Sequence, residues 1–355
     1  MIDKNTRAEV GQSGAMSTST HDAPISQPPM IGRRRSLARW ISWLFGFAAL
    51  VAVGLFAAHF TEEKAFARLL VQARPAWLVL GLVLQLGTYL ADARIWQCVL
   101  RRANISRPLR SYVGLGFAKL LMDQVVPSGG MSGTFLVVDA LDHRGVPRGA
   151  SMAGVVVDLV SYYAAYVATL ALALGIVWLH GDLRLFVLLP AAVFAPLAAA
   201  VPTMVLFVSR GRALPHWITR LPLIKAVLRA LVEATPGIAH DVSLIARCTT
   251  LQLAIFVLDA GTLWVMLWAL GLAVHAAPVF ASFMLSTLAR TLGPIPGGLG
   301  VFEAASVATL KLMGVPVAAA LAATLLFRGF SFWLPMVPGL VFARRESRSP
   351  RASVN

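Results

Sequence analysis

Two ionisable residues, Arg290 and Glu303, lie in an apolar stretch, residues 282–314, whose middle is broken by glycine and proline. Ionisable side chains at membrane depth are costly, and those that occur there usually serve a function. A guanidinium can bind a lipid phosphate, with help from free N–H groups of residues 297–300 at the start of a helix. We therefore expect Arg290 and Glu303 to bind a polar headgroup. The structural alternative is that Glu303 caps its helix or pairs with Arg290.

Four further charged residues in apolar segments are candidate substrate-binding residues: Lys119, Asp123, Asp158 and Arg328. Asp158 and Arg328 are expected to face one another across the centre of the molecule, either at a binding site or as a structural ion pair. Lys119 and Asp123 are four residues apart on one predicted helix, so they can pair with each other.

Three other charged residues also fall within apolar segments: Asp92, Arg94 and Asp259. Asp92 and Arg94 are two residues apart and point to different faces of a helix, so we expect them to interact with neighbouring helices rather than with each other. Asp259 is expected to belong to the central cavity.

The residue types needed for enzyme or metal chemistry are poorly placed. The histidines fall in loops or at the ends of apolar segments, and none lies at membrane depth beside a carboxylate. Cys98 and Cys248 lack the spacing of a metal site and cannot form a disulfide scaffold. The sequence has no nucleophile elbow and no phosphate-binding loop. We therefore expect no catalytic residue, no cofactor and no metal.

The composition places these residues in an all-α integral membrane protein. Of the 355 residues, 58% are hydrophobic and 13% are charged, and the mean hydropathy is +0.74. A helix needs about 20 apolar residues to cross a bilayer. By this criterion we predict six full spans, at residues 40–60, 76–100, 150–178, 183–208, 247–272 and 316–342.

Two apolar stretches, residues 111–142 and 282–314, are not typical of simple spans because proline and glycine residues interrupt each in its middle. As a helix, the first arm of residues 111–126 would extend only about 24 Å, which is short of the roughly 30 Å hydrocarbon core. We therefore predict two re-entrant helical hairpins. Their loop residues are Pro127, Gly129, Gly130 and Gly133 in the first, and Pro294, Pro296, Gly297, Gly298 and Gly300 in the second.

The two broken stretches match when Pro127 is aligned with Pro296, an alignment that we call the proline register. Continued without a gap, it places the triplet GVP at 145–147 on the GVP at 314–316. The sequence thus predicts a duplication, with repeat one at about 37–180 and repeat two at about 183–342. Inverted repeats with broken helices near the midplane are typical of transporters.

The net charge of +15 is best explained by the side of the membrane on which the loops lie. If both broken stretches are hairpins, most Lys and Arg residues fall on one side, which predicts that both termini are cytoplasmic. We predict a disordered basic tail at 1–36, a membrane domain at 37–345 and a short tail at 346–355. The loop 209–246 is either a basic amphipathic helix on anionic inner-leaflet lipids or an ordinary linker helix. We expect no nucleic-acid partner.

Three motifs resemble a known family: PIPGGLGVFEAA at 294–305, PSGG at 127–130 followed by DALDHRGVP at 139–147, and VVVDLVSYY at 155–163. They are similar to the lysylphosphatidylglycerol synthase transmembrane family, over about residues 70–345. The resemblance implies a flippase-like membrane domain of the bacterial cytoplasmic membrane that moves lipids, in some relatives in connection with hopanoid pathways. The chain resembles a stand-alone member, without the aminoacyltransferase domain of the full-length synthases.

The first hypothesis is therefore a lipid flippase or transporter that works by alternating access on a phospholipid or another polar-headed lipid. A membrane-embedded enzyme of lipid or polyprenyl-linked sugar metabolism, with Glu303 as acid or base, is the alternative. A third possibility is an accessory subunit that presents its basic loop to a lipid-biosynthetic partner.

Overall fold

The computed structural model describes residues 73–125, 131–179, 230–292 and 295–346, together with short pieces between 192 and 204. All of these belong to one unit, residues 39–355. Where the structure describes it, the chain is helical and has no strand. The predicted spans at 40–60 and 183–208 and the two predicted tails lie wholly or mostly outside these residues.

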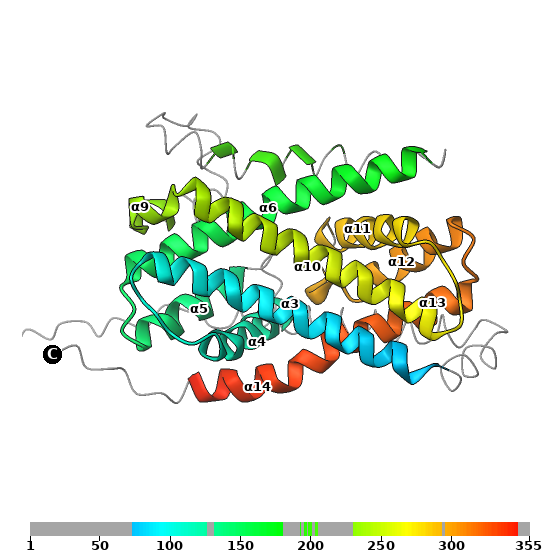
Figure 1. Ribbon diagram of the computed structural model, residues 1–355, viewed down its shortest axis with the longest axis horizontal. Coiled ribbons are helices and arrows are strands. Elements are labelled where there is room, and N and C mark those ends of the chain that lie inside the picture. The colour runs from blue at the N-terminus through cyan, green and yellow to red at the C-terminus, as the bar shows by residue number, and fades with distance from the viewer. Residues whose placement is uncertain are drawn as a thin grey trace, which may run out of the picture. The chain divides into compact units, whose positions relative to one another are not determined.

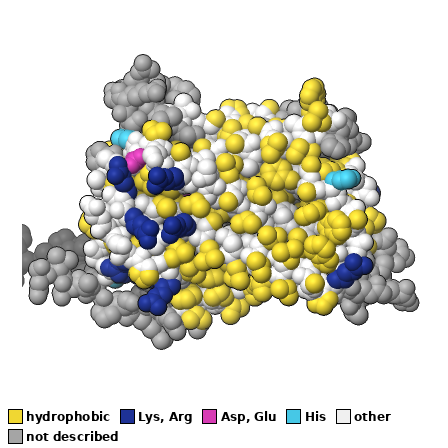
Figure 2. Space-filling model, in the orientation of Figure 1, with side chains coloured by type: hydrophobic (Ala, Val, Ile, Leu, Met, Phe, Trp, Pro, Cys, Tyr) yellow, Lys and Arg dark blue, Asp and Glu magenta, His cyan; other side chains and the backbone are white. Residues whose placement is uncertain are grey.

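Within the described residues, four helices are long and apolar enough to cross a membrane, and they correspond to four of the predicted spans. They are α3 (Pro75–Arg102), α6 (Arg148–Leu179), α10 (Val242–Ala269) and the continuous segment Val317–Phe342. Large apolar side chains on their outer surfaces are exposed, such as Val79, Val83 and Val337. Hydrophobic side chains cover much of the face in Figure 2. A bilayer would cover this surface.

The two broken stretches form helix–break–helix units. In the first, α4 (Arg110–Val125) packs on α5 (Met131–His143). In the second, α11 (Ala276–Leu292) is followed by a 3₁₀ turn, η2 (Pro296–Gly298), and by α12 (Val301–Leu312), which packs back on α11. Figure 1 shows the α4–α5 unit toward one end of α3 and α10 and the α11–α12 unit toward the other.

The break of the second unit contacts the end of α4 in the first. A β-carbon on Gly297 would lie 2.5 Å from the Phe332 ring and 3.5 Å from the carbonyl oxygen of Gln124. Gln124 is near the end of α4, so the break of the second unit lies against the end of the first arm of the first unit. Gly297 and Gly298 both have positive φ, 62° and 63°, a conformation that glycine adopts without steric cost.

The segment after α12 forms α13 (Val317–Arg328), a π turn, η3 (Gly329–Trp333), and α14 (Leu334–Glu346). Pro335 has no N–H to donate, so the helix widens and Leu334 donates to the carbonyl of Gly329. The carbonyl of Phe330 accepts a hydrogen bond from the Tyr89 hydroxyl at 2.9 Å. Freed backbone groups within a membrane need such a partner from a neighbouring helix.

The two halves share backbone details at the ends of their helices. Gly145 ends α5 and Gly314 ends α12, with φ of 74° and 86°. In both turns the next residue, Val146 or Val315, donates its N–H to the carbonyl five residues earlier at 3.0 Å. This is the hydrogen-bond pattern of a glycine C-cap. The proline register therefore relates two turns of the same geometry.

Before the breaks, a second alignment of the two halves fits better than the proline register. Both α3 and α10 have 28 residues, so aligning Pro75 with Val242 at their starts also aligns Arg102 with Ala269 at their ends. We call this alignment the helix register. The offset between aligned residues is two residues smaller than in the proline register. The second half therefore has two more residues than the first between the end of this helix and the loop proline.

A side-chain bond after each of these helices supports the helix register. In each half a side chain near the end of the helix donates to the carbonyl ten residues later. Gln97 donates to Arg107 at 3.1 Å, and Trp264 donates to Val274 at 2.7 Å. The helix register aligns both members of these two pairs.

The predicted amphipathic helix at 209–246 lies largely outside the described residues. From residue 230 onward the chain is not one helix, because it turns before α9 (Pro236–Ala239) and again before α10. Asp241 caps α10 by accepting the N–H of Leu244 at 3.1 Å. This bond, with a further one from Arg102, holds the pKa of Asp241 below its ordinary value.

The close approach of α4 and α5 depends on Gly133. A β-carbon there would lie 2.3 Å from the carbonyl oxygen of Lys119 and 2.7 Å from the carboxyl carbon of Asp123. We expect Gly133→Ala to force the two helices apart and to destabilise the folded protein by about 1–3 kcal/mol. Thermal unfolding of the detergent-solubilised protein measures this.

Gly175→Ala is the matched control, because a β-carbon at Gly175 meets nothing within 4 Å. It should leave stability unchanged or raise it slightly, since alanine is the better helix former. Equal melting temperatures for Gly133→Ala and Gly175→Ala would contradict the idea that α4 and α5 approach too closely at Gly133 to admit a β-carbon.

Candidate functional site

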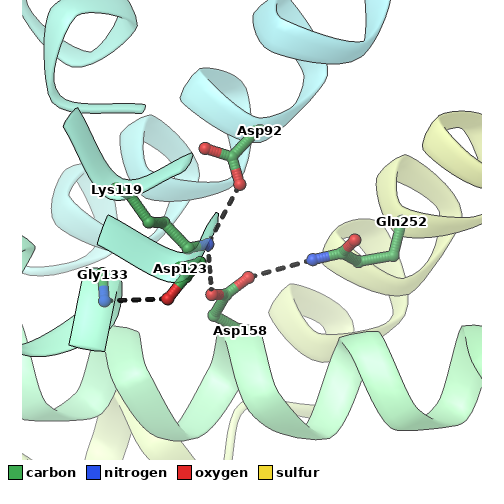
Figure 3. Close-up of polar contacts among 6 residues, drawn as sticks. All are labelled: Asp92, Lys119, Asp123, Gly133, Asp158 and Gln252. Atoms are coloured by element: carbon green, nitrogen blue, oxygen red, sulfur yellow. Dashed lines mark hydrogen bonds and ion pairs between the residues drawn. The ribbon is translucent and has the colours of Figure 1, made fainter. Parts of the chain in front are cut away.

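One polar cluster lies where α3, α4 and α6 meet, and Lys119 is at its centre. The Lys119 ammonium lies 3.1 Å from Asp92 Oδ1 and 2.8 Å from Asp158 Oδ2. All three side chains are largely buried. Figure 3 shows the ammonium between these two carboxylates, which come from different helices. The ion pairs therefore join the first helix–break–helix unit to the helices on both sides of it.

Two hydrogen bonds extend this cluster. Asp158 Oδ1 accepts from the Gln252 side chain at 2.9 Å, which brings in α10. Asp123 Oδ1 accepts from the N–H of Gly133 at 2.8 Å, which joins the two arms of the first unit. The predicted pairing of Lys119 with Asp123 is wrong, because the ammonium reaches across to two other helices while Asp123 bonds the backbone of α5.

The cluster contains more carboxyl groups than cationic groups. It holds three carboxyl groups, those of Asp92, Asp123 and Asp158, and one ammonium. Asp92 Oδ2 is buried and has no hydrogen-bond partner among the described residues. The first half of the molecule therefore places an excess of acidic groups in its interior.

A second polar cluster forms at the start of α12. Glu303 Oε2 accepts the N–H of Gly300 at 2.7 Å, so Glu303 caps its own helix. Glu303 Oε1 accepts from Arg328 Nε at 2.8 Å, and both side chains are deeply buried. Arg328 also donates to the carbonyl of Gly297 at 2.9 Å and stacks over Phe332, 4.3 Å from the ring centre.

These contacts test several predictions about the charged residues of the second half. The capping role of Glu303 is confirmed. Its predicted pairing with Arg290 is wrong, and so is the expectation that Asp158 and Arg328 face one another, because each of these charges has a partner within its own half. The N–H groups of Gly298 and Gly300 are bonded to Ile295 and Glu303, so they are not free to hold a phosphate.

Arg290 lies near the end of α11, and its side chain is half-buried. Its stem packs on Gly298, where a β-carbon would lie 1.9 Å from Arg290 Cγ. It has no hydrogen bond or ion pair with any residue in the described part of the chain. Its charge acts electrostatically on Tyr162 and Tyr166 of α6 and on Asp259 of α10.

The other predicted charged residues have protein partners. Asp259 Oδ1 accepts from the Gln85 side chain at 2.8 Å. Asp92 contacts a neighbouring helix, as expected, through Lys119. Arg94 does not, because it is exposed and bonds to Gln97 on its own helix.

The predicted loop residues fall in different places. Pro296, Gly297 and Gly298 form the 3₁₀ turn, and Gly300 is the N-cap of α12. Gly133 is not in a loop but inside α5. Pro127, Gly129, Gly130 and Pro294 lie outside the described residues.

Sequence reasoning missed two polar residues, Gln85 and Gln252, that bond to the buried carboxylates. The helix register aligns these two glutamines with each other, and it also aligns Asp92 with Asp259. The repeat of a glutamine and an aspartate at the same spacing was therefore a signal in the sequence. A single glutamine in an apolar helix does not stand out without that alignment.

No group of three or more His, Cys, Asp or Glu side chains within the described segments is arranged to hold a metal ion. The described residues offer a guanidinium, that of Arg290, which has no partner among them, and an acidic cluster around Lys119 from the other half.

Residues 43–339 match a family model described as the lysylphosphatidylglycerol synthase TM region. A search of curated proteins found no match.

Lys119 should stabilise the fold through its two ion pairs. We expect Lys119→Met to destabilise the protein by about 3–5 kcal/mol, because Asp92 and Asp158 would stay buried without a counter-charge. A second change, Asp158→Asn, should recover part of this loss. Thermal unfolding in detergent is the measurement. Lys311→Met is the control, since Lys311 is exposed at the end of α12 and is expected to be neutral.

Glu303 should likewise be needed for folding because it neutralises Arg328. We expect Glu303→Gln to cost about 3–5 kcal/mol, and the double variant Glu303→Gln, Arg328→Met to be more stable than the single one. Chemical unfolding followed by tryptophan fluorescence tests both. If the single variant unfolded like the parent, the ion pair would not be holding the turn before α12.

Proposed function

Because the chain belongs to the lysylphosphatidylglycerol synthase transmembrane family, we propose that this multi-pass membrane protein moves a phosphate-bearing lipid across the bacterial cytoplasmic membrane. The lipid phosphate binds Arg290. The observation that supports this most is that Arg290 has no protein partner among the described residues, although it lies at membrane depth.

The other cations at this depth are already engaged. Lys119 pairs with Asp92 and Asp158, and Arg328 pairs with Glu303. Arg94 points outward and bonds Gln97. A guanidinium in an apolar interior needs an anion or water, and a phosphate suits its fork of donors. The Tyr162 hydroxyl beside Arg290 can donate a further hydrogen bond to the same headgroup.

The architecture that we propose has six spans, two re-entrant hairpins in an inverted repeat, and both termini in the cytoplasm. The arms of the hairpins have 16, 13, 17 and 12 residues. As helices they extend about 18–26 Å, which is less than the hydrocarbon core. The matching helix ends and the contact of the second break with the end of α4 support this arrangement.

In this arrangement the two halves rock against each other about the contact between Gly297 and Gln124. The headgroup stays between the Arg290 side and the acidic Lys119 cluster, while the acyl chains remain in lipid. The sequence has no nucleotide-binding loop, so we propose that an ion or lipid gradient, or removal of the lipid after transport, supplies the energy. A hopanoid-related lipid is one substrate within this class.

Enzymatic use of Glu303 has no specific support. Both of its carboxylate oxygens are bonded, one to the Gly300 N–H and the other to Arg328. A role as accessory subunit would depend on the loop 209–246, most of which lies outside the described residues. We therefore propose lipid movement alone.

The proposal predicts that Arg290→Gln slows lipid movement at least tenfold, since loss of a hydrogen bond to a charged group costs about 1.5–3 kcal/mol. The test uses proteoliposomes with fluorescent phosphatidylglycerol and measures how fast the label becomes accessible to a membrane-impermeant quencher. Arg94→Gln is the control, because it removes a guanidinium at similar depth that faces outward. If the parent and Arg290→Gln moved lipid at the same rate, Arg290 would not be the headgroup site.

A further inference from the structure

The hydroxyl of Tyr112, at the start of α4, is buried and has no hydrogen-bond partner among the described residues. Tyr112 is 1% exposed. A buried hydroxyl that finds no partner is costly, so such a group in a native protein needs an explanation. A ligand oxygen would supply the missing partner.

Arg144 bonds the carbonyl of Ser111, the residue before Tyr112, and three arginines in all have charges that act on the hydroxyl: Arg101, Arg107 and Arg144. They come from the end of α3, from the linker before α4, and from the turn between α5 and α6. Arg107 and Arg144 are half-buried rather than extended into solvent. Together with Tyr112 they form what we call the Tyr112 site.

Hydrogen bonds to the backbone fix two of these arginines in place. Arg107 Nη2 donates to the carbonyl of Arg144 at 2.9 Å, and Arg144 Nη1 donates to the carbonyl of Ser111 at 3.1 Å. The Gln97 side chain holds the linker by donating to the carbonyl of Arg107 at 3.1 Å. The site is therefore organised before any ligand arrives.

The positive charge at this end of the molecule is only partly neutralised. Arg102 pairs with Asp241 at 2.6 Å and Arg148 with Glu233 at 2.8 Å. Arg101 and Arg107 form no ion pair with a carboxylate in the described part of the chain. Figure 2 shows Lys and Arg side chains gathered at one end of the face, next to the hydrophobic surface.

The fold does not require arginine at these positions. In the helix register, Arg101, Arg107 and Tyr112 correspond to Trp268, Val274 and Val279 of the second half, and in the proline register Arg144 corresponds to Met313. The second half keeps the linker bond, with Trp264 donating to the carbonyl of Val274. The same backbone thus forms with apolar residues, and the charges serve another purpose.

We propose that the Tyr112 site binds the phosphate of an anionic phospholipid headgroup whose acyl chains lie on the adjoining hydrophobic surface. Guanidinium groups and a phenol hydroxyl are the donors that a phosphate takes. The site lies at the end of the helices, apart from Arg290, and the inference does not depend on lipid transport.

The test titrates full-length protein in detergent with phosphatidylglycerol and follows binding by native mass spectrometry. We expect Arg101→Gln, Arg107→Gln together to weaken binding at least tenfold. The matched control pair, Arg102→Gln, Arg148→Gln, removes the same charge from guanidiniums that already have carboxylate partners, and should bind as the parent does. Equal weakening by both double variants would show that the lipid is attracted by the overall positive charge and not bound at the Tyr112 site. That result would overturn the proposal.

Tyr112→Phe gives a second readout that a structural role would not produce. Removal of an unpartnered hydroxyl should leave the melting temperature without lipid unchanged or raised, yet weaken phosphatidylglycerol binding several-fold. Loss of stability with unchanged binding would contradict the proposal. Displacement of the lipid by equimolar inorganic phosphate would instead show a site for a free anion and overturn the lipid assignment. All of these variants are made on an Arg290→Gln background, which removes the phosphate site of the transport proposal and leaves binding at the Tyr112 site to be measured alone.

Discussion

The apolar surroundings of the helices oblige each buried charge to find its partner on another helix, and much of the structure follows from this constraint. Lys119 joins α4 to α3 and α6, and through Asp158 and Gln252 the contact reaches α10. Arg328 ties α13 to the turn before α12 through Glu303 and Gly297. In water such ion pairs would contribute little, but in an apolar interior the loss of either partner leaves an unneutralised charge. The charges that have partners hold the bundle, whereas Arg290 has no partner in the described part of the chain.

The two halves share several turns and hydrogen bonds and differ in their charges. Their helix ends use the same glycine turns and linker hydrogen bonds, because turn geometry depends on backbone conformation more than on the side chains around it. At the matching positions Asp123 and Arg290 are of opposite charge type, and Thr134 stands where the second half has Glu303. The first half therefore places an acidic cluster in the interior, and the arginines at its end align with apolar residues of the second half.

Much of the fold could be predicted because the length of a membrane span and the positions where a helix breaks depend on local sequence. Four predicted spans are long apolar helices, and both broken stretches are helix–break–helix units, since proline and glycine interrupt helices wherever they are packed. The family was also recognisable from the motifs around the breaks. The pairing of charges could not be predicted in the same way. Lys119 and Asp123 have the spacing of a helical ion pair, yet Lys119 turns toward two other helices.

The sequence by itself determined that this is a helical membrane protein of a lipid-related family, where its helices break, and which charges lie at membrane depth. These properties depend on local composition and spacing. Only the tertiary structure decided that Glu303 neutralises Arg328, that Asp158 neutralises Lys119, and that Arg290 and the Tyr112 hydroxyl have no partner in the described part of the chain. The reason is that ion pairing depends on which helices pack together and at what rotation, and residues far apart in sequence set both.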